Sequence, residues 1–286
     1  MILRDRIAQD EILVAPGVYD GLSAALATQA GFEALYLSGA AVAYTRLGRP
    51  DIGLSTSSEM ADTMALVADR TDLPVIIDAD TGFGNALNAR RTMQMYERAG
   101  AAALQMEDQT FPKRCGHLAD KSLIPKADMV GKIAAMADAR RHDTLIIART
   151  DAIAVEGFDE AMARAGAYVE AGADVLFVEA PRDGEELRSI AQRFGERVPL
   201  LANMVEGGAT PIRDADELES MGFDIVIFPG GIVRALAHAA RDYYASLRAH
   251  GSNQPFAERM FDFDGLNDVI ETRDTLAMGR KYDGPQ

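Results

Sequence analysis

Short runs of apolar residues alternate along the chain with longer segments in which apolar residues recur at helical spacing. The apolar runs are rich in Val, Ile and Leu, and they occupy residues 12–17, 34–39, 74–80, 102–108, 144–151, 174–180, 199–204 and 224–230. Several follow a phrase such as "RAGAAALQM" or "EAGADVLFV", in which a glycine can end a helix before the chain enters a strand. The pattern therefore predicts eight consecutive strand–helix units.

Strands that are apolar along their whole length are typical of a parallel sheet covered by helices on both faces. Eight such units favour an α/β fold closed into a (β/α)8 barrel of the TIM type. A doubly wound open sheet is the alternative, because counting strands does not prove closure. We expect residues 1–251 to form one barrel domain that carries the catalytic site. Residues 252–286 have amphipathic periodicity, and we expect them to form a C-terminal helical extension.

Composition and charge narrow the classes of partner. No apolar run approaches the roughly 18 residues of a membrane span. The N-terminus carries charges where a signal peptide is apolar, so we expect a cytoplasmic protein with no membrane partner. A net charge of −15 disfavours nucleic-acid binding. An anion site in this chain must therefore be built from local cations or a metal ion.

Carboxylates follow three of the predicted strands, at the end where a barrel places its active site. Asp78 and Asp80 alternate at the end of one run, so both can point at one centre, and Glu107 and Glu179 end two others. For an isolated acid, capping of the following helix is the alternative interpretation. Crowded carboxylates need neutralisation, and oxygen ligands of this kind suit Mg²⁺, or Mn²⁺ in its place. Convergence of acids from separate strands favours a metal site.

Two arginines are candidates for binding a substrate carboxylate. Arg149 ends an apolar strand, where its guanidinium needs a carboxylate that accepts its two N–H donors. That partner is either the substrate or a protein carboxylate. Arg234 begins the helix after the eighth run, near the position where many barrels bind anions. The alternative for Arg234 is a solvated helix residue.

The only cysteine of the chain, Cys115, lies in a polar loop within residues 105–121. Lys113, Arg114 and His117 flank it in sequence, and cations near a thiol lower its pKa and allow proton exchange near neutral pH. A buried filler residue and a Cys–His nucleophile are the alternatives. The loop thus combines a candidate acid with groups that attract anions.

The sequence resembles the isocitrate lyase and phosphoenolpyruvate mutase superfamily, and in particular its short bacterial lyases. The matching segments, in family order, are "YLSGAAVA", "LGRPDIG", "DADTGFGN", "EDQTFPKRCGH", "ARTDA", "FVEA" and "LANMVEGGATP". The resemblance runs from about Pro16 to Arg234. It implies a barrel fold, dependence on Mg²⁺, and homotetramers that are dimers of helix-swapped dimers.

The resemblance also implies roles for individual residues. Asp80 would hold Mg²⁺, with Asp78 and Glu107 acting through water. The implied substrate-binding residues are Ser38, Gly39, Ala40, Asp51, Gly116, Glu179, Asn203 and Arg234. The implied catalytic residues are Lys113, Arg114, Cys115, His117, Arg149 and Tyr36. Lys113 to His117 would lie on a gating loop, with Cys115 as the acid that protonates the departing carbanion and Tyr36 as the proton acceptor for the substrate hydroxyl.

The implied reaction is a retro-aldol cleavage of a 2-hydroxy di- or tricarboxylate, such as 2-methylisocitrate or 2,3-dimethylmalate, to pyruvate and a carboxylic acid. The run "NMVEGGATP" is also similar to oxaloacetate hydrolases and to carboxyphosphonoenolpyruvate phosphonomutases. Those two activities are therefore alternatives on the same scaffold. A barrel that binds a small carboxylate without turnover is a third, non-enzymatic hypothesis.

Overall fold

The computed structural model describes residues 2–116, 120–208, 210–211 and 213–283. Among these residues, eight parallel strands close into one barrel in sequence order, and β1 pairs with both β2 and β8. The strands are β1 (Leu13–Val18), β2 (Leu35–Leu37), β3 (Val75–Asp78), β4 (Ala103–Glu107), β5 (Leu145–Thr150), β6 (Val175–Val178), β7 (Leu200–Asn203) and β8 (Ile225–Phe228). The predicted (β/α)8 barrel is confirmed, and the open-sheet alternative is excluded.

The two faces of each strand contribute to different parts of the core. One buried cluster draws on strands all round the barrel and includes Tyr36, Ile76 and Phe177, so it fills the interior. Intervening strand residues such as Leu37 join a second cluster with helix residues such as Met93. Burial on both faces explains why the strands are continuous apolar runs in the sequence.

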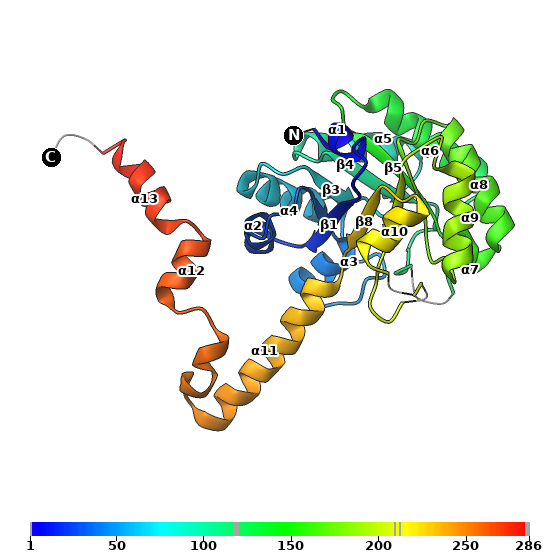
Figure 1. Ribbon diagram of the computed structural model, residues 1–286. Coiled ribbons are helices and arrows are strands. Elements are labelled where there is room, and N and C mark those ends of the chain that lie inside the picture. Colours follow the sequence, from blue (N-terminus) through cyan, green and yellow to red (C-terminus); the bar gives the residue numbers. More distant parts are fainter. Residues whose placement is uncertain (1, 117–119, 209, 212, 284–286) are drawn as a thin grey trace. The chain divides into compact units, whose positions relative to one another are not determined.

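The helices of the barrel unit flank its strands, with α2 and α4 on one side and α8 and α9 on the other (Figure 1). The longer connecting helices are α2 (Gly21–Gln29), α4 (Ser57–Arg70), α5 (Ala86–Arg98), α6 (Lys126–Ala139), α8 (Phe158–Glu170), α9 (Gly184–Phe194) and α10 (Ala215–Met221). Short segments α1 (Leu3–Ile7), α3 (Gly39–Val42), η1 (Ala43–Leu47) and α7 (Ala152–Val155) complete the unit. Side chains cap several helix starts; for example, Asp20 accepts from Ser23 N at 2.7 Å.

The chain divides into two compact units, residues 1–232 and 233–286. Most of α11 (Gly231–His250) lies in the second unit, with η2 (Gln254–Arg259), α12 (Phe263–Val269) and α13 (Thr272–Arg280). The first unit ends at residue 232, before the boundary that was expected after residue 251, and that boundary stays a prediction. Helices therefore do form the C-terminal extension. No helix among the described residues is long and apolar enough to cross a membrane.

Candidate active site

Charged side chains from successive strands meet at the carboxyl ends of β3 to β6. Asp78 and Glu107 are the last residues of β3 and β4, Arg149 lies near the end of β5, and Glu179 follows β6 directly. Arg149 Nη1 is 3.5 Å from Glu107 Oε2, and Arg149 Nη2 is 3.7 Å from Glu179 Oε2. Asn203, at the end of β7, donates from Nδ2 to Glu179 Oε2 at 3.1 Å. The structure thus brings Glu107, Glu179 and, through Glu179, Asn203 together with Arg149.

Asp78 and Asp80 lie beside the loop that follows β2. Asp78 Oδ1 accepts from Asp80 N at 3.0 Å, and its Oδ2 accepts from Gly39 N at 3.3 Å. A Cβ on residue 39 would lie 2.8 Å from Asp78 Oδ2, so only glycine fits there without a shift. Asp80 has φ +46°, a left-handed conformation that is uncommon outside glycine and clusters at functional sites. The backbone therefore has an uncommon conformation at Asp80 and a close approach at Gly39, where the metal ion was expected.

Lys113 is buried between two carboxylates. Its ammonium lies 2.6 Å from Asp51 Oδ1 and 2.7 Å from Asp80 Oδ1. Burial raises the pKa of Asp80 from 3.8 to about 7, with Lys113 opposing this shift and Asp78 adding to it. Burial alone would lower the pKa of Lys113, but the surrounding carboxylates raise it well above its usual value, so the ammonium stays charged. Lys113 therefore neutralises part of the acidic cluster.

The oxygens of this cluster suit a hard divalent cation. Glu107 Oε1 is buried and has no hydrogen-bond partner, although a buried carboxylate oxygen is normally paired. Among the described residues, no group of three or more His, Cys, Asp or Glu side chains is arranged to hold a metal ion directly. Mg²⁺ usually takes only one or two carboxylates and completes its octahedron with water and substrate oxygens. The donor set therefore fits Mg²⁺ with few direct protein ligands.

Arg149 has a protein carboxylate as its partner. Its Nε donates to Asp151 Oδ2 at 2.9 Å and its Nη2 to Asp151 Oδ1 at 3.0 Å, a bidentate pair. The guanidinium also lies over the Phe177 ring, 5.1 Å from its centroid. Of the two partners considered from the sequence, the structure provides the protein one. Asp151 holds one edge of the guanidinium, formed by Nε and Nη2, and Nη1 lies toward Glu107.

Cys115 and Gly116 lie beside this arginine. Cys115 N donates to the carbonyl oxygen of Asp51 at 3.2 Å, and the Cys115 side chain is partly buried. A Cβ on Gly116 would collide with Arg149 Nη2 and with the carboxylate of Glu179. The backbone at Gly116 is thus packed against the charged residues, and the thiol is one residue away. The predicted residue His117 lies outside the described residues.

Arg114 is placed differently from its neighbours. Its side chain is about half exposed, and Nη1 lies 3.4 Å from Asp120 Oδ2. Its backbone is held by Gln109, which accepts from Arg114 N at 2.9 Å and donates to Arg114 O at 2.8 Å. The backbone of Arg114 therefore helps to shape the loop. A catalytic role for its side chain stays a prediction.

Tyr36 is a hydrogen-bond donor within the barrel. Its hydroxyl lies 2.5 Å from Gln105 Oε1 and donates to it. Burial raises the pKa of Tyr36 well above 10, and the charge of Asp78 raises it further, so the phenol is neutral near pH 7. A neutral phenol is a poor proton acceptor, and the role of Tyr36 as the base for a substrate hydroxyl stays a prediction.

The remaining predicted substrate-binding residues are Ser38 and Ala40, which follow β2, and Arg234. Ser38 is the N-cap of α3, its Oγ accepting from Ala41 N at 3.2 Å, and Ala40 lies in the single turn that follows. Both are next to Gly39 and hence next to Asp78. Arg234 belongs to the second unit, and its role in binding stays a prediction.

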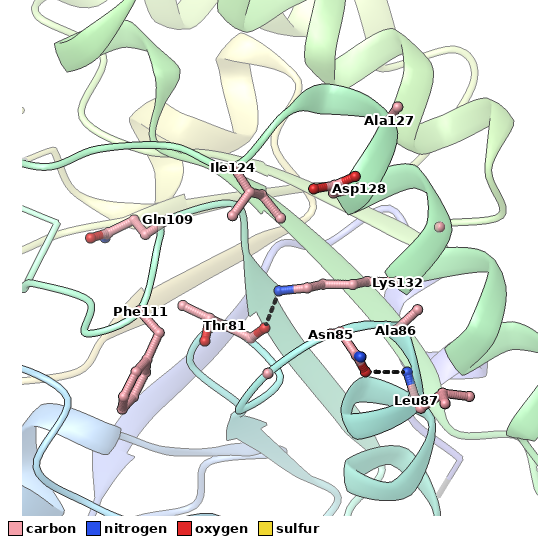
Figure 2. A pocket seen from close by; sticks show the side chains of 12 residues that line it. Thr81, Asn85, Ala86, Leu87, Gln109, Phe111, Ile124, Ala127, Asp128 and Lys132 are labelled. Carbon is pink, nitrogen blue, oxygen red and sulfur yellow. Dashed lines mark hydrogen bonds between the residues drawn. The ribbon is translucent and has the colours of Figure 1, made fainter.

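A cavity of about 610 Å³ lies beside the site, bounded by the starts of α5 and α6 (Figure 2). Figure 2 shows Lys132 extending from α6 toward Thr81, whose carbonyl oxygen accepts from Lys132 Nζ at 2.9 Å. The side chain of Lys132 is buried, and burial lowers its pKa. Because Thr81 follows Asp80, this hydrogen bond helps to hold the left-handed turn that presents the Asp80 carboxylate.

Sequence reasoning assigned no role to several residues that build the site. Asp151 is two positions after Arg149, and strand alternation could have suggested that both side chains share one face. Lys121 bonds Asp151 at 2.9 Å, a contact that depends on the path of an irregular loop. Asp108 accepts from Tyr168 Oη at 2.7 Å and from Asp151 N at 3.0 Å. These contacts hold Asp151 in place, and Asp151 in turn holds Arg149.

A closed barrel whose mouth gathers buried carboxylates around a lysine and an arginine defines an enzyme for small anionic substrates. The chain belongs to the phosphoenolpyruvate phosphomutase family, whose profile matches residues 3–248. It is 47% identical over 274 residues to a 2-methylisocitrate lyase of Aeropyrum pernix, covering 96% of this chain and 88% of that protein. It is 41% identical over 271 residues to a 2,3-dimethylmalate lyase of Eubacterium barkeri, covering 94% and 92%. The family resemblance expected from the sequence is confirmed.

Solved structures give the same result. A crystal structure of 2,3-dimethylmalate lyase superposes with a TM-score of 0.93 at 38% identity, covering 98% of this chain and 94% of that one. A phosphonopyruvate hydrolase determined in complex with oxalate and Mg²⁺ superposes with a TM-score of 0.87 at 31% identity, covering 98% of each chain. The family therefore includes lyases and at least one enzyme that binds a divalent metal ion.

Proposed function

We propose that this protein is a Mg²⁺-dependent carbon–carbon lyase. Its substrate is a 2-hydroxy di- or tricarboxylate such as 2-methylisocitrate or 2,3-dimethylmalate, which it cleaves to pyruvate and a carboxylic acid. The observation that carries this proposal is the position of Gly116, whose backbone lies against Arg149 and Glu179 beside the only thiol. A proton donor is thereby held next to a cation, as the cleavage of a carboxylate-stabilised carbanion requires. The names and identities of the relatives support the same reaction class.

The metal ion belongs to the acidic cluster. Asp80 would hold Mg²⁺, or Mn²⁺ in its place, with Asp78 and Glu107 contributing through water. A bound divalent cation lowers the pKa of a coordinated hydroxyl and polarises the carbonyl group that forms. The unpaired Glu107 Oε1 and the left-handed turn at Asp80 support this assignment. Gly39 permits close approach to Asp78, so the β2 loop can lie against the substrate's carboxylate end.

The chain's own residues provide charge and a proton. Breaking the C–C bond leaves its electron pair on the departing fragment. The substrate hydroxyl loses its proton, and the carbon that bears it becomes the carbonyl carbon of a keto acid. Asp151 holds the guanidinium of Arg149 in place, with Nη1 directed toward Glu107. The positive charge of the guanidinium meets the negative charge on the departing fragment. Cys115 gives its thiol proton to the carbanion, and the proton from the hydroxyl ultimately restores the neutral thiol.

We further propose a cytoplasmic homotetramer, a dimer of helix-swapped dimers, with no nucleic-acid partner. The second unit supports an assembly, because several of its large apolar side chains are not buried within it, including Phe261, Phe263, Leu276 and Met278. Apolar side chains in such numbers usually mark a surface that another chain covers. The net charge of −15 agrees with the absence of a nucleic-acid partner.

A panel of acids tests the function directly. Purified enzyme is incubated with 2-methylisocitrate, 2,3-dimethylmalate, oxaloacetate or phosphonopyruvate, with Mg²⁺ or with EDTA, and keto acid is measured with coupled lactate dehydrogenase. We expect Mg²⁺-dependent pyruvate from at least one of the two hydroxy acids. The matched control is Cys115→Ser, which should bind the same metal but turn over slowly.

Two other outcomes would replace this proposal. Oxalate and acetate formed from oxaloacetate, with no pyruvate from either hydroxy acid, would identify a hydrolase. A shift of the phosphorus NMR signal of phosphonopyruvate or carboxyphosphonoenolpyruvate would identify a phosphonomutase. Absence of any turnover across the panel would leave only ligand binding.

A further inference from the structure

Lys121 and Asp151 form a buried ion pair outside the residues assigned so far. The Lys121 ammonium lies 2.9 Å from Asp151 Oδ1, and the two side chains are 2% and 0% exposed. The same ammonium donates to the carbonyl oxygen of Gly116. Removing two charges from water carries a large desolvation penalty, so a buried pair is weak support for stability alone. The pair therefore needs another explanation.

Asp151 connects this lysine to the arginine of the site. Its Oδ1 accepts from both Lys121 Nζ and Arg149 Nη2, and its Oδ2 accepts from Arg149 Nε at 2.9 Å. Asp151 is itself fixed, because its backbone N–H donates to Asp108 Oδ1 at 3.0 Å. One carboxylate thus holds a cation from the loop and a cation from β5 in a single arrangement.

The loop reaches the same arginine at a second point. The backbone at Gly116 leaves no space for a side chain between itself, Arg149 Nη2 and Glu179. Lys121 donates to the Gly116 carbonyl oxygen, and the Arg149 guanidinium packs against the Gly116 backbone. Cys115 precedes that peptide, and Cys115 N is bonded to Asp51 O at 3.2 Å. The position of the thiol therefore depends on Lys121 on one side and on Asp51 on the other.

We propose that Lys121 is a positioning residue that ties the Cys115–Gly116 backbone to the Arg149–Asp151 pair. The proton donor, Cys115, and the cation that meets the carbanion, Arg149, are then held in fixed positions relative to each other. Lys121 also shares the charge of Asp151, so Arg149 is less neutralised and binds a substrate carboxylate more strongly. This inference rests on the proposed lyase function for its kinetic part only.

The test compares Lys121→Met with wild type and with a matched control, Lys126→Met. Lys126 is a lysine five positions further along whose side chain is 40% exposed, and its ammonium lies 3.3 Å from Glu160 Oε1. Because Cys115 is the only cysteine, the rate of alkylation by iodoacetamide reports on that thiol without interference. We expect K121M to alkylate severalfold faster than wild type and K126M to match wild type. Lys121→Arg, which keeps the charge, should return the rate most of the way.

Kinetics supply the second readout. With 2-methylisocitrate or 2,3-dimethylmalate and Mg²⁺, we expect kcat of K121M to fall about 10- to 100-fold, the range for a donor displaced by a fraction of an ångström. KM should rise by a smaller factor than kcat falls, because Arg149 binds the substrate carboxylate less strongly without Lys121 while the metal site is not touched. Thermal midpoints of the variants should lie close together.

Each result of these measurements either supports or overturns the proposed role of Lys121. Wild-type alkylation and kcat in K121M would overturn the proposal, as would a loss of kcat that follows only the unfolded fraction and is not restored in K121R. If K121M does not fold, Lys121→Gln keeps an N–H donor group without the charge and answers the same question, and wild-type behaviour in it would also overturn the proposal. Alkylation rates do not depend on turnover, so an altered rate in an enzyme inactive on all acids would reject the lyase function and not the role of Lys121.

Discussion

The single thiol has the most specific role in the proposed reaction. Cys115 is held by its own N–H to Asp51 and lies one residue from the backbone that packs on Arg149. It takes no part in a disulfide, and its side chain is only partly buried. The proton-donor role that we propose for Cys115 needs only one cysteine.

Replacing the thiol by a weaker acid should stop proton transfer without unfolding the barrel. We expect Cys115→Ser to lower kcat by at least about 100-fold, the low end for a positioned general acid. Metal binding, followed by calorimetry with Mg²⁺, and the thermal midpoint should remain close to wild type. Near-normal turnover would assign the thiol to packing.

Asp80 should make metal binding depend on pH. Burial raises its pKa to about 7, so below pH 7 a metal ion has to displace a proton, whereas above it the carboxylate is free to bind. Affinity for Mg²⁺ should therefore rise roughly tenfold between pH 6 and pH 8 and then level off. Calorimetric titrations at pH 6, 7 and 8 check this. The matched variant Asp80→Asn should bind weakly at every pH, and an affinity of wild type that does not change with pH would contradict the assignment.

The strand–helix units were predictable because their apolar runs are set by burial on both faces. Seven of the eight observed strands lie within a run seen in the sequence, and β1 extends one residue beyond its run to Val18; the carboxylates at the run ends do meet at one mouth. The contacts of Lys113 and Lys121 were not predictable, because they depend on how two irregular loops fold over each other. No periodicity encodes such a path. The short helices α3 and α7 escaped prediction for the same reason.

Asp108 connects β4, β5 and α8 through hydrogen bonds. Among the contacts between elements near the site, we expect its loss to lower the free energy of unfolding most. It accepts from Thr150 Oγ1 at 2.8 Å, Asp151 N at 3.0 Å and Tyr168 Oη at 2.7 Å. Asp108→Ala leaves these buried donors without a partner and should lower the free energy of unfolding by about 3–5 kcal/mol. Tyr168→Phe removes the hydroxyl that donates to Asp108 and accepts from Arg164 Nη1 at 3.3 Å, and it should cost about 1–2 kcal/mol. Urea unfolding at a fixed protein concentration measures both, and equal costs for the two variants would contradict a shared hub.

At the scale of the whole chain, the second unit should decide the assembly. Phe263 and Leu276 are 84% and 59% exposed within it. If another chain covers them, Phe263→Asp and Leu276→Asp should shift the mass in light scattering from a tetramer toward smaller species. Arg273→Asp, whose side chain is 82% exposed, is the polar control and should leave the mass unchanged. A wild-type mass equal to one chain would rule out the tetramer.

The two bonds to Asp51 have a consequence for protein engineering. Its carboxylate binds Lys113 and its carbonyl oxygen binds Cys115, so two loops separated by about sixty positions in sequence act as one module. An exchange of the cysteine loop alone for that of a relative would leave the recipient's Asp51 segment mismatched. Swapping specificity between these enzymes should therefore require transplanting both loops together.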